Sequence, residues 1–201
     1  TLFNYSDWDN ARDFDESAQP VTHIIENPNV KSCFISLWIK QLSDMYEDSS
    51  GGEIGSKKPA VVNIRVEVGL VKEDGTQEKY NDRFFQIIAL IESPVILDLG
   101  SQDNESSLEY YSDVREVNPF NSSDSAVINQ EGLYTPFALP EITQQTETDT
   151  EFREDGSVKR YIKITKLSTE TESSLVKKDI DLLKVTEVIE STCSYPLSAL
   201  V

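Results

Sequence analysis

The strongest regularity in this chain is an alternation of apolar and polar residues along two long segments. From Ala60 to Lys72, the even-numbered positions up to 70 are apolar, with polar residues between them in the middle of the segment. A similar alternation runs from Val30 to Leu42, where the odd-numbered positions from 33 to 39 are apolar. A period of two over this length predicts half-buried antiparallel strands rather than helices.

Turn signals divide the rest of the chain into shorter segments with strand-like composition. An Asn-Pro-Asn run at 27–29 and Asp-Gly pairs at 74–75 and 155–156 are typical of turns. Pro94 separates two apolar segments, which predicts two short strands or one bulged edge strand. Besides the two long strands, the predicted strands are Thr22–Glu26, Thr76–Phe84, Phe85–Ile91, Val95–Leu99, Ser157–Leu167 and Ile180–Ile189. A short helix at the start of the last segment is an alternative, but its β-branched residues favour a strand.

This pattern predicts an all-β protein, because several strands follow one another with no convincing amphipathic helix between them. We expect an antiparallel β-sandwich of the immunoglobulin or fibronectin type III kind, with a long irregular insertion. Its core is predicted to contain Ile35, Leu37, Val62, Ile64, Val66, Val68, Ile162 and Ile164.

Two segments stand outside the strand pattern. Residues 1–19 hold five acidic residues interleaved with four aromatic ones, which predicts an acidic surface arm. Residues 91–156 are rich in Ser, Asn, Asp and Pro, so they are predicted to be an insertion or a small subdomain within a sandwich module spanning 20–201. Because the chain starts at Thr1 and ends at Val201 within an apolar run, we expect it to be a module of a longer polypeptide.

The net charge narrows the classes of partner. The 201 residues include 36 acidic and 18 basic ones, which gives a formal charge of −18 at pH 7. Nucleic acids and anionic membrane surfaces bind through clustered Lys and Arg, so neither is expected as a partner. No apolar stretch approaches the roughly 20 residues that span a bilayer, so membrane insertion is not expected.

Catalytic and metal-binding chemistry find little support in the sequence. His23 is the only histidine, and no serine lies in the glycine-flanked turn of a nucleophile elbow. Two cysteines and one histidine far apart in sequence do not suggest a zinc site. We therefore expect no catalytic residue, no metal and no cofactor, with His23 in a structural role. Cys33 and Cys193 are expected to be free thiols, and a disulfide between them is the alternative.

Recognition of a partner is better supported. Exposed aromatic residues on the predicted insertion would stack on sugars or fill a partner's pocket. The candidate contact residues are Tyr110, Tyr111, Phe120, Tyr134 and Phe137. The alternative is that the insertion needs these rings for a small core of its own.

Four segments give the chain a resemblance to a known family. They are Val21–Leu37, Tyr161–Ser168, Val185–Glu190 and Tyr195–Val201. Together they resemble the tail-tip hub (J-type, host-specificity) proteins of long-tailed bacteriophages. The shared features, in this order, are a threonine-led strand with an Asn-Pro turn and a long alternating strand, then a closing strand, and then a returning segment. The closing strand departs from the family's Arg-rich form because it is Lys-rich, and residues 91–156 have no counterpart.

The resemblance implies a non-enzymatic structural module of a tail-tip hub that contributes to tail-tip assembly and host-cell attachment. Its implied partners are other tail-tip proteins, copies of the parent chain in a trimer, and a receptor on the host surface. The implied location is the tail tip of a virion assembled in the host cytoplasm, where thiols stay reduced. The sandwich pattern alone equally fits an immunoglobulin-like module of a bacterial surface or secreted adhesin, for which a Cys33–Cys193 disulfide is expected.

Overall fold

The chain is built from β-strands in the part that its computed structural model describes. The described residues are 20–25, 27–47, 53–72, 74–101, 112–117, 127–129, 134–141, 159–167 and 176–189. Within these ranges there are eleven β-strands and no α-helix. The strands are β1 (Val21–Ile25), β2 (Val30–Met45), β3 (Lys57–Lys58), β4 (Ala60–Val71), β5 (Gln77–Ala89), β6 (Val95–Leu99), β7 (Ser112–Val117), β8 (Val127–Asn129), β9 (Phe137–Ala138), β10 (Arg160–Leu167) and β11 (Lys177–Ile189).

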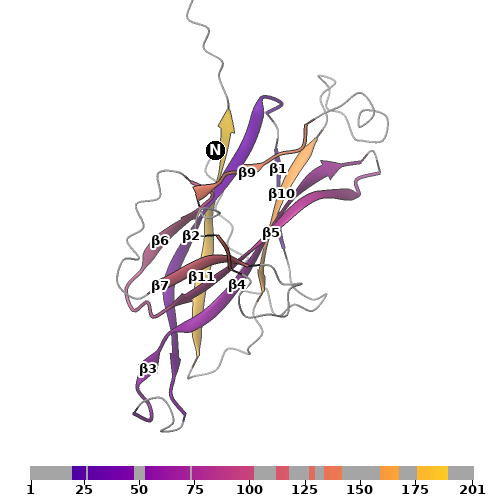
Figure 1. Cartoon of the computed structure of the whole chain (residues 1–201). Helices are drawn as coiled ribbons and strands as arrows, with labels where there is room; N and C mark the ends of the chain where they lie inside the picture. Colours follow the sequence, from indigo (N-terminus) through magenta and orange to yellow (C-terminus); the bar gives the residue numbers. More distant parts are fainter. Residues whose placement is uncertain are drawn as a thin grey trace, which may run out of the picture.

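The described strands form two sheets in which all pairings are antiparallel. The six-stranded sheet has the order β1-β10-β4-β5-β7-β8. In the five-stranded sheet, β2 is central and pairs with β11, β3, β6 and β9. Figure 1 shows β2 and β11 running side by side, with β10, β4 and β5 together in the other sheet. The predicted antiparallel all-β sandwich is thus confirmed, and its immunoglobulin-like kinship stays a prediction.

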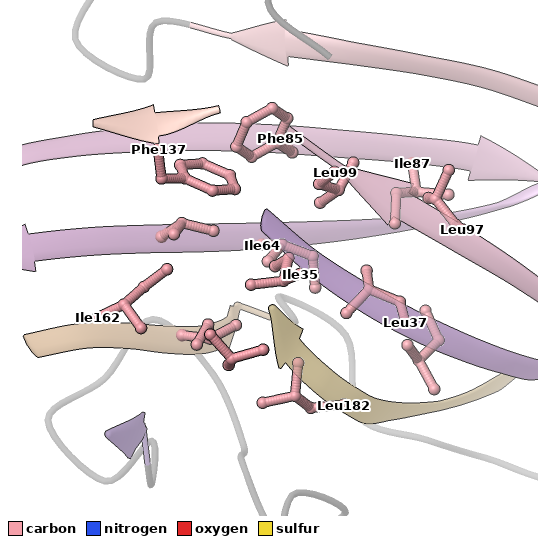
Figure 2. Packing of buried hydrophobic residues seen from close by; sticks show 14 of the residues in the cluster. Ile35, Leu37, Ile64, Phe85, Ile87, Leu97, Leu99, Phe137, Ile162 and Leu182 are labelled. Atoms are coloured by element: carbon pink, nitrogen blue, oxygen red, sulfur yellow. The ribbon is translucent and has the colours of Figure 1, made fainter. Parts of the chain in front are cut away.

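One hydrophobic core lies between the two sheets. Alternate residues of β2, β4, β5 and β10 enter it, as Figure 2 shows for Ile35, Ile64, Phe85 and Ile162. All eight residues that the sequence predicted for the core belong to this cluster, so that prediction is confirmed. Burying an aliphatic side chain of this size contributes about 1.5–3 kcal/mol, which makes this layer the main source of stability.

Two bulges in β2 bring residues of both parities into the core. Val30 and Leu42 are buried, although the inward-facing residues between them are odd-numbered. The pairing with β11 skips Lys31 and Lys40, which are the extra residues of the two bulges. An extra residue exchanges the two faces of the strand beyond it, so the alternation of β2 continues into the core with shifted numbering.

One predicted strand boundary is wrong. β5 continues from Gln77 to Ala89, whereas the sequence predicted two strands that meet between Phe84 and Phe85. The strand continues because β4 offers an antiparallel partner along its whole length. The chain leaves the six-stranded sheet after Ala89, since Ile91 already bridges to Leu42 of β2, and β6 begins directly after Pro94 and pairs with β2. β11 is a strand throughout.

The described parts of residues 91–156 belong to both sheets. β6 and β9 pair with β2, and β7 pairs with β5. The segment therefore contributes structure to the sandwich itself. The expected domain boundaries stay predictions, and the predicted acidic arm, residues 1–19, lies outside the described residues.

Candidate functional site

A cavity of about 240 Å³ lies between the two sheets beside β9. The residues that shape it include Val66, Val68, Asn81, Arg83, Glu116 and Phe137. On β4 and β5, Val66 stands opposite Arg83 and Val68 opposite Asn81, so both pairs share the face that looks toward β9. The wall of the cavity is therefore apolar on β4 and Phe137, and polar along β5 and β7.

Arg83 connects the two sides of the cavity. Its Nε and Nη2 donate to the two carboxylate oxygens of Glu116, each at 2.9 Å, and its Nη1 donates to the carbonyl of Thr135 at 2.7 Å. The guanidinium carbon lies 5.1 Å from the ring centre of Phe85 and 4.8 Å from that of Phe137. A bidentate pair with two aromatic neighbours holds the guanidinium in one orientation, so it forms a rigid part of the wall.

The structure separates the sequence-predicted contact residues. Phe137 is only 2% exposed and packs edge-on against Phe85 with ring centres 5.7 Å apart, so its ring belongs to the main core rather than to an exposed surface. Tyr134 is 43% exposed and precedes Thr135, which lines the cavity. Tyr110, Tyr111 and Phe120 lie outside the described residues, and their role stays a prediction.

Sequence reasoning missed Tyr80, which is 64% exposed next to the cavity-lining Asn81. Val68 pairs with Asn81 and Gly69 with Lys79, so Tyr80 is the extra residue of a bulge in β5. Bulges commonly redirect a side chain beside a functional surface. Within a strand of ordinary composition, no local signal marks the position of this bulge.

A second polar cluster lies on the other face of the six-stranded sheet, centred on the buried Glu67. Its Oε1 accepts from the Tyr161 hydroxyl at 2.6 Å and lies 2.7 Å from Lys163 Nζ, and its Oε2 lies 2.9 Å from Arg65 Nη2. Burial by itself raises the pKa of Glu67, but hydrogen bonds from Lys163 and Tyr161, with the charges of Lys163 and Arg65, hold it below its ordinary value. Burial and the neighbouring Glu67 carboxylate raise the pKa of Tyr161 well above its usual range.

This cluster predicts loss of stability in acid. Since the pKa of Glu67 is lower in the folded state than its ordinary value of 4.5, its stabilising contribution is present above that value and is lost as the pH falls through the folded pKa. Urea unfolding at a series of pH values should show a decline in the free energy of unfolding that is smaller in the Glu67→Gln variant than in the wild type. Glu92→Gln is the control, because Glu92 forms an exposed pair with Lys57 and should leave the decline unchanged. Equal pH profiles for the wild type and Glu67→Gln would contradict the prediction.

A third polar cluster joins the edges of the two sheets. His23 Nε2 on β1 lies 3.0 Å from Glu187 Oε1 on β11, and His23 is buried. Arg160 on β10 donates from Nη1 to the carbonyl of Val30 at 2.8 Å and from Nη2 to those of Asn27 and Pro28 at 3.1 and 3.0 Å. These contacts give His23 and Arg160 structural partners between the sheets.

Cys33 is a free thiol buried beside this cluster, as the sequence predicted, while Cys193 lies outside the described residues. Burial and the nearby Glu187 charge, opposed by Arg160, raise the pKa of the Cys33 thiol to about 12. Because the thiolate is the reactive form, iodoacetamide at neutral pH should label Cys33 only after unfolding. Tryptic mapping checks this, since residues 32–40 carry Cys33 in a peptide separate from Cys193. Labelling of that peptide in the native protein would contradict the prediction.

No group of three or more His, Cys, Asp or Glu side chains in the described ranges could hold a metal ion. Among the same residues, no helix is long and apolar enough to cross a membrane. The chain matches no known protein-family model and no curated protein sequence.

Proposed function

We propose that this chain is a non-enzymatic structural module of a bacteriophage tail-tip hub, with a role in tail-tip assembly and host-cell attachment. Its partners in this proposal are other tail-tip proteins, copies of the parent chain in a trimer, and a receptor on the host. It needs no cofactor, and it is located at the tail tip of the virion.

The observation that carries the proposal is that the segments resembling the tail-tip family pair with one another in the fold. Val21–Leu37 contains β1 and much of β2, and the later segments contain β10 and the end of β11. β1 pairs with β10, and β2 pairs with β11. Segments that are more than a hundred residues apart in sequence, as Val21 and Ile164 are, thus form one structural unit, as expected of a single inherited module.

The contacts across the two sheets strengthen this argument. Arg160, at the start of the closing strand, donates to carbonyls of the Asn-Pro turn, and His23 on the first strand meets Glu187 on the returning strand. The contact of His23 with Glu187 joins two of the segments that carry the resemblance, and Arg160 directly precedes a third, Tyr161–Ser168. The free Cys33 favours the tail-tip function over the adhesin, which would use it in a disulfide.

Immunogold electron microscopy tests the proposal. Antibodies raised against the 201-residue chain would be applied to purified phage particles from the source that encodes it and, separately, to the bacterial cells. Gold at the tail tip is the expected result, with antibody absorbed on the purified chain as the control. Gold on the cell surface without particles would identify the adhesin, and gold on the capsid alone would also overturn the proposal.

A further inference from the structure

We propose that the outer face of the five-stranded sheet binds a neutral saccharide, with the ring of Trp38 stacked on the apolar face of one pyranose unit. This inference deepens the proposed function, on which it rests for a ligand at the host surface. It assigns host attachment to one site and gives the chemical class of the ligand.

Trp38 and Ile96 form an exposed apolar pair on this outer face. They stand opposite one another where β2 pairs with β6. Trp38 is 38% exposed and Ile96 is 50% exposed, whereas the strand neighbours of Trp38, Leu37 and Ile39, are fully buried in the core. Because successive side chains of a strand point to opposite faces, the Trp38 ring lies on the side of the sheet that faces away from the core.

Hydrogen-bonding side chains surround the Trp38 ring. Asp181 on β11 stands opposite Trp38, and its Oδ2 lies 2.8 Å from Lys40 Nζ. The same Nζ lies 5.3 Å from the centre of the Trp38 ring. On β6, Asp98 is the diagonal neighbour of Trp38 and accepts a hydrogen bond from Ser36. These contacts orient the polar groups around the ring before a ligand binds.

The pairing of these charges favours a neutral ligand over a charged one. Lys40 is already paired with Asp181 and Asp179, so a charged partner would have to compete with existing ion pairs. A carboxylate has about four acceptor sites, and a lysine ammonium donates more than one hydrogen bond. A sugar hydroxyl both donates and accepts, so it can join such a pair without breaking it.

The size and polarity of the patch favour a saccharide over a protein. Trp38 exposes roughly 100 Å², if a tryptophan presents about 250 Å², and this is small beside the roughly 1,000 Å² that a specific protein interface buries. The centre of a protein interface is also depleted in charged residues, whereas Lys40 and Asp181 directly border the ring. A pyranose presents an apolar C–H face to the ring and leaves its hydroxyls at the rim for these charged groups.

The probes for the test are four neutral disaccharides, namely maltose, lactose, mannobiose and diacetylchitobiose, with the acyclic polyol sorbitol. Each is titrated into the isotope-labelled 201-residue chain and followed by NMR. At least one disaccharide should shift the indole N–H resonance of Trp38, with a dissociation constant of roughly millimolar order. Sorbitol should bind roughly tenfold more weakly or worse, because it has hydroxyls but no ring face to stack on the indole.

Variants of Trp38 show whether its ring is the binding surface. The amide resonances of Ile96 and Asp181 report binding in every variant. Trp38→Val should abolish the disaccharide shifts, whereas Trp38→Tyr should preserve them because it keeps an aromatic ring. Tyr80→Val is the matched control: Tyr80 is an aromatic residue that is 64% exposed, but it lies on the six-stranded sheet, so its loss should leave binding unchanged.

A second pair of variants tests the polar groups beside the ring. Asp181→Asn should weaken disaccharide binding roughly fivefold, because hydroxyl groups donate more strongly to a carboxylate than to an amide. Asp179→Asn is its control, since Asp179 also pairs with Lys40 but stands opposite Gln41 instead of Trp38. Each variant removes one charge and leaves Lys40 one carboxylate partner.

Each other outcome overturns the inference. Absence of shifts with all four disaccharides, equal binding of sorbitol, binding that survives in Trp38→Val, or equal weakening by the two Asp→Asn substitutions would each do so. Shifts at Ile96 that depend on protein concentration without sugar would show that a second copy covers this face, and would also overturn it. The test is separate from immunogold labelling: sugar binding without labelled tails would refute the phage assignment only, and labelled tails without sugar binding would refute only this site.

Discussion

Replacing Gly69 by alanine is expected to destabilise the protein by about 3 kcal/mol or more, because the added methyl group has no space. A Cβ at this position would lie 2.1 Å from the backbone carbonyl oxygen of Glu78 and 2.7 Å from Cε1 of the Tyr161 ring. The first contact involves backbone, so β5 itself would have to move. Thermal unfolding followed by circular dichroism should show a fall of roughly 6–12 °C, or no folded protein.

Gly75→Ala is the matched control for this prediction. Gly75 has a φ of +80° in the turn between β4 and β5, but no atom lies within 4 Å of its added Cβ. The Gly75→Ala substitution should lower the free energy of unfolding only through backbone strain, by about 1 kcal/mol. If Gly75→Ala proved as harmful as Gly69→Ala, close packing under Tyr161 would not be the reason for glycine at position 69.

Replacing Arg160 by methionine should cost about 3 kcal/mol, although the volume of the side chain is nearly kept. Arg160 is buried and donates to the carbonyls of Val30, Asn27 and Pro28. Methionine would leave these acceptors in the protein without their donor, and an unpaired buried acceptor costs about 1–3 kcal/mol. Urea unfolding followed by the fluorescence of the two tryptophans measures the loss.

Lys40→Met provides the comparison for Arg160. Lys40 is also a cation in a long side chain, but it lies on the outer face and pairs with Asp179 and Asp181 near water. Partly exposed pairs of this kind contribute about 0–1 kcal/mol, so this variant should stay close to the wild type. Hydrogen exchange should also quicken at Val30 in Arg160→Met only. Similar losses in both variants would show that Arg160 has no special role in holding the turn.

The sequence alone determined the fold class and eight residues of the core of this protein. Val62 to Val68 and Ile35 to Ile39 alternate because one face of each strand packs in the hydrophobic core, where apolar residues are favoured, and the other face lies outside it. The same reasoning placed the turn at 27–29 and the start of β6 after Pro94, since proline and asparagine restrict the backbone wherever they occur. These are local effects, so a single sequence is enough to show them.

Only the tertiary structure decided which strands pair and where the alternation shifts. The bulges at Lys31, Lys40 and Tyr80 arise from fitting two long strands to their partners, and no residue type marks them. The continuity of β5 through Phe84 and Phe85 likewise depends on β4 as its neighbour.

The candidate site shows the same limit. Tyr134 and Phe137 are close in sequence and both aromatic, yet one is exposed and the other is in the core. Arg83, Glu116 and Thr135 meet because β5, β7 and the segment before β9 are brought together from distant parts of the chain. Residue type and spacing report the preference of each side chain for water, but a cavity is a property of the surfaces that remain unfilled after the sheets have packed.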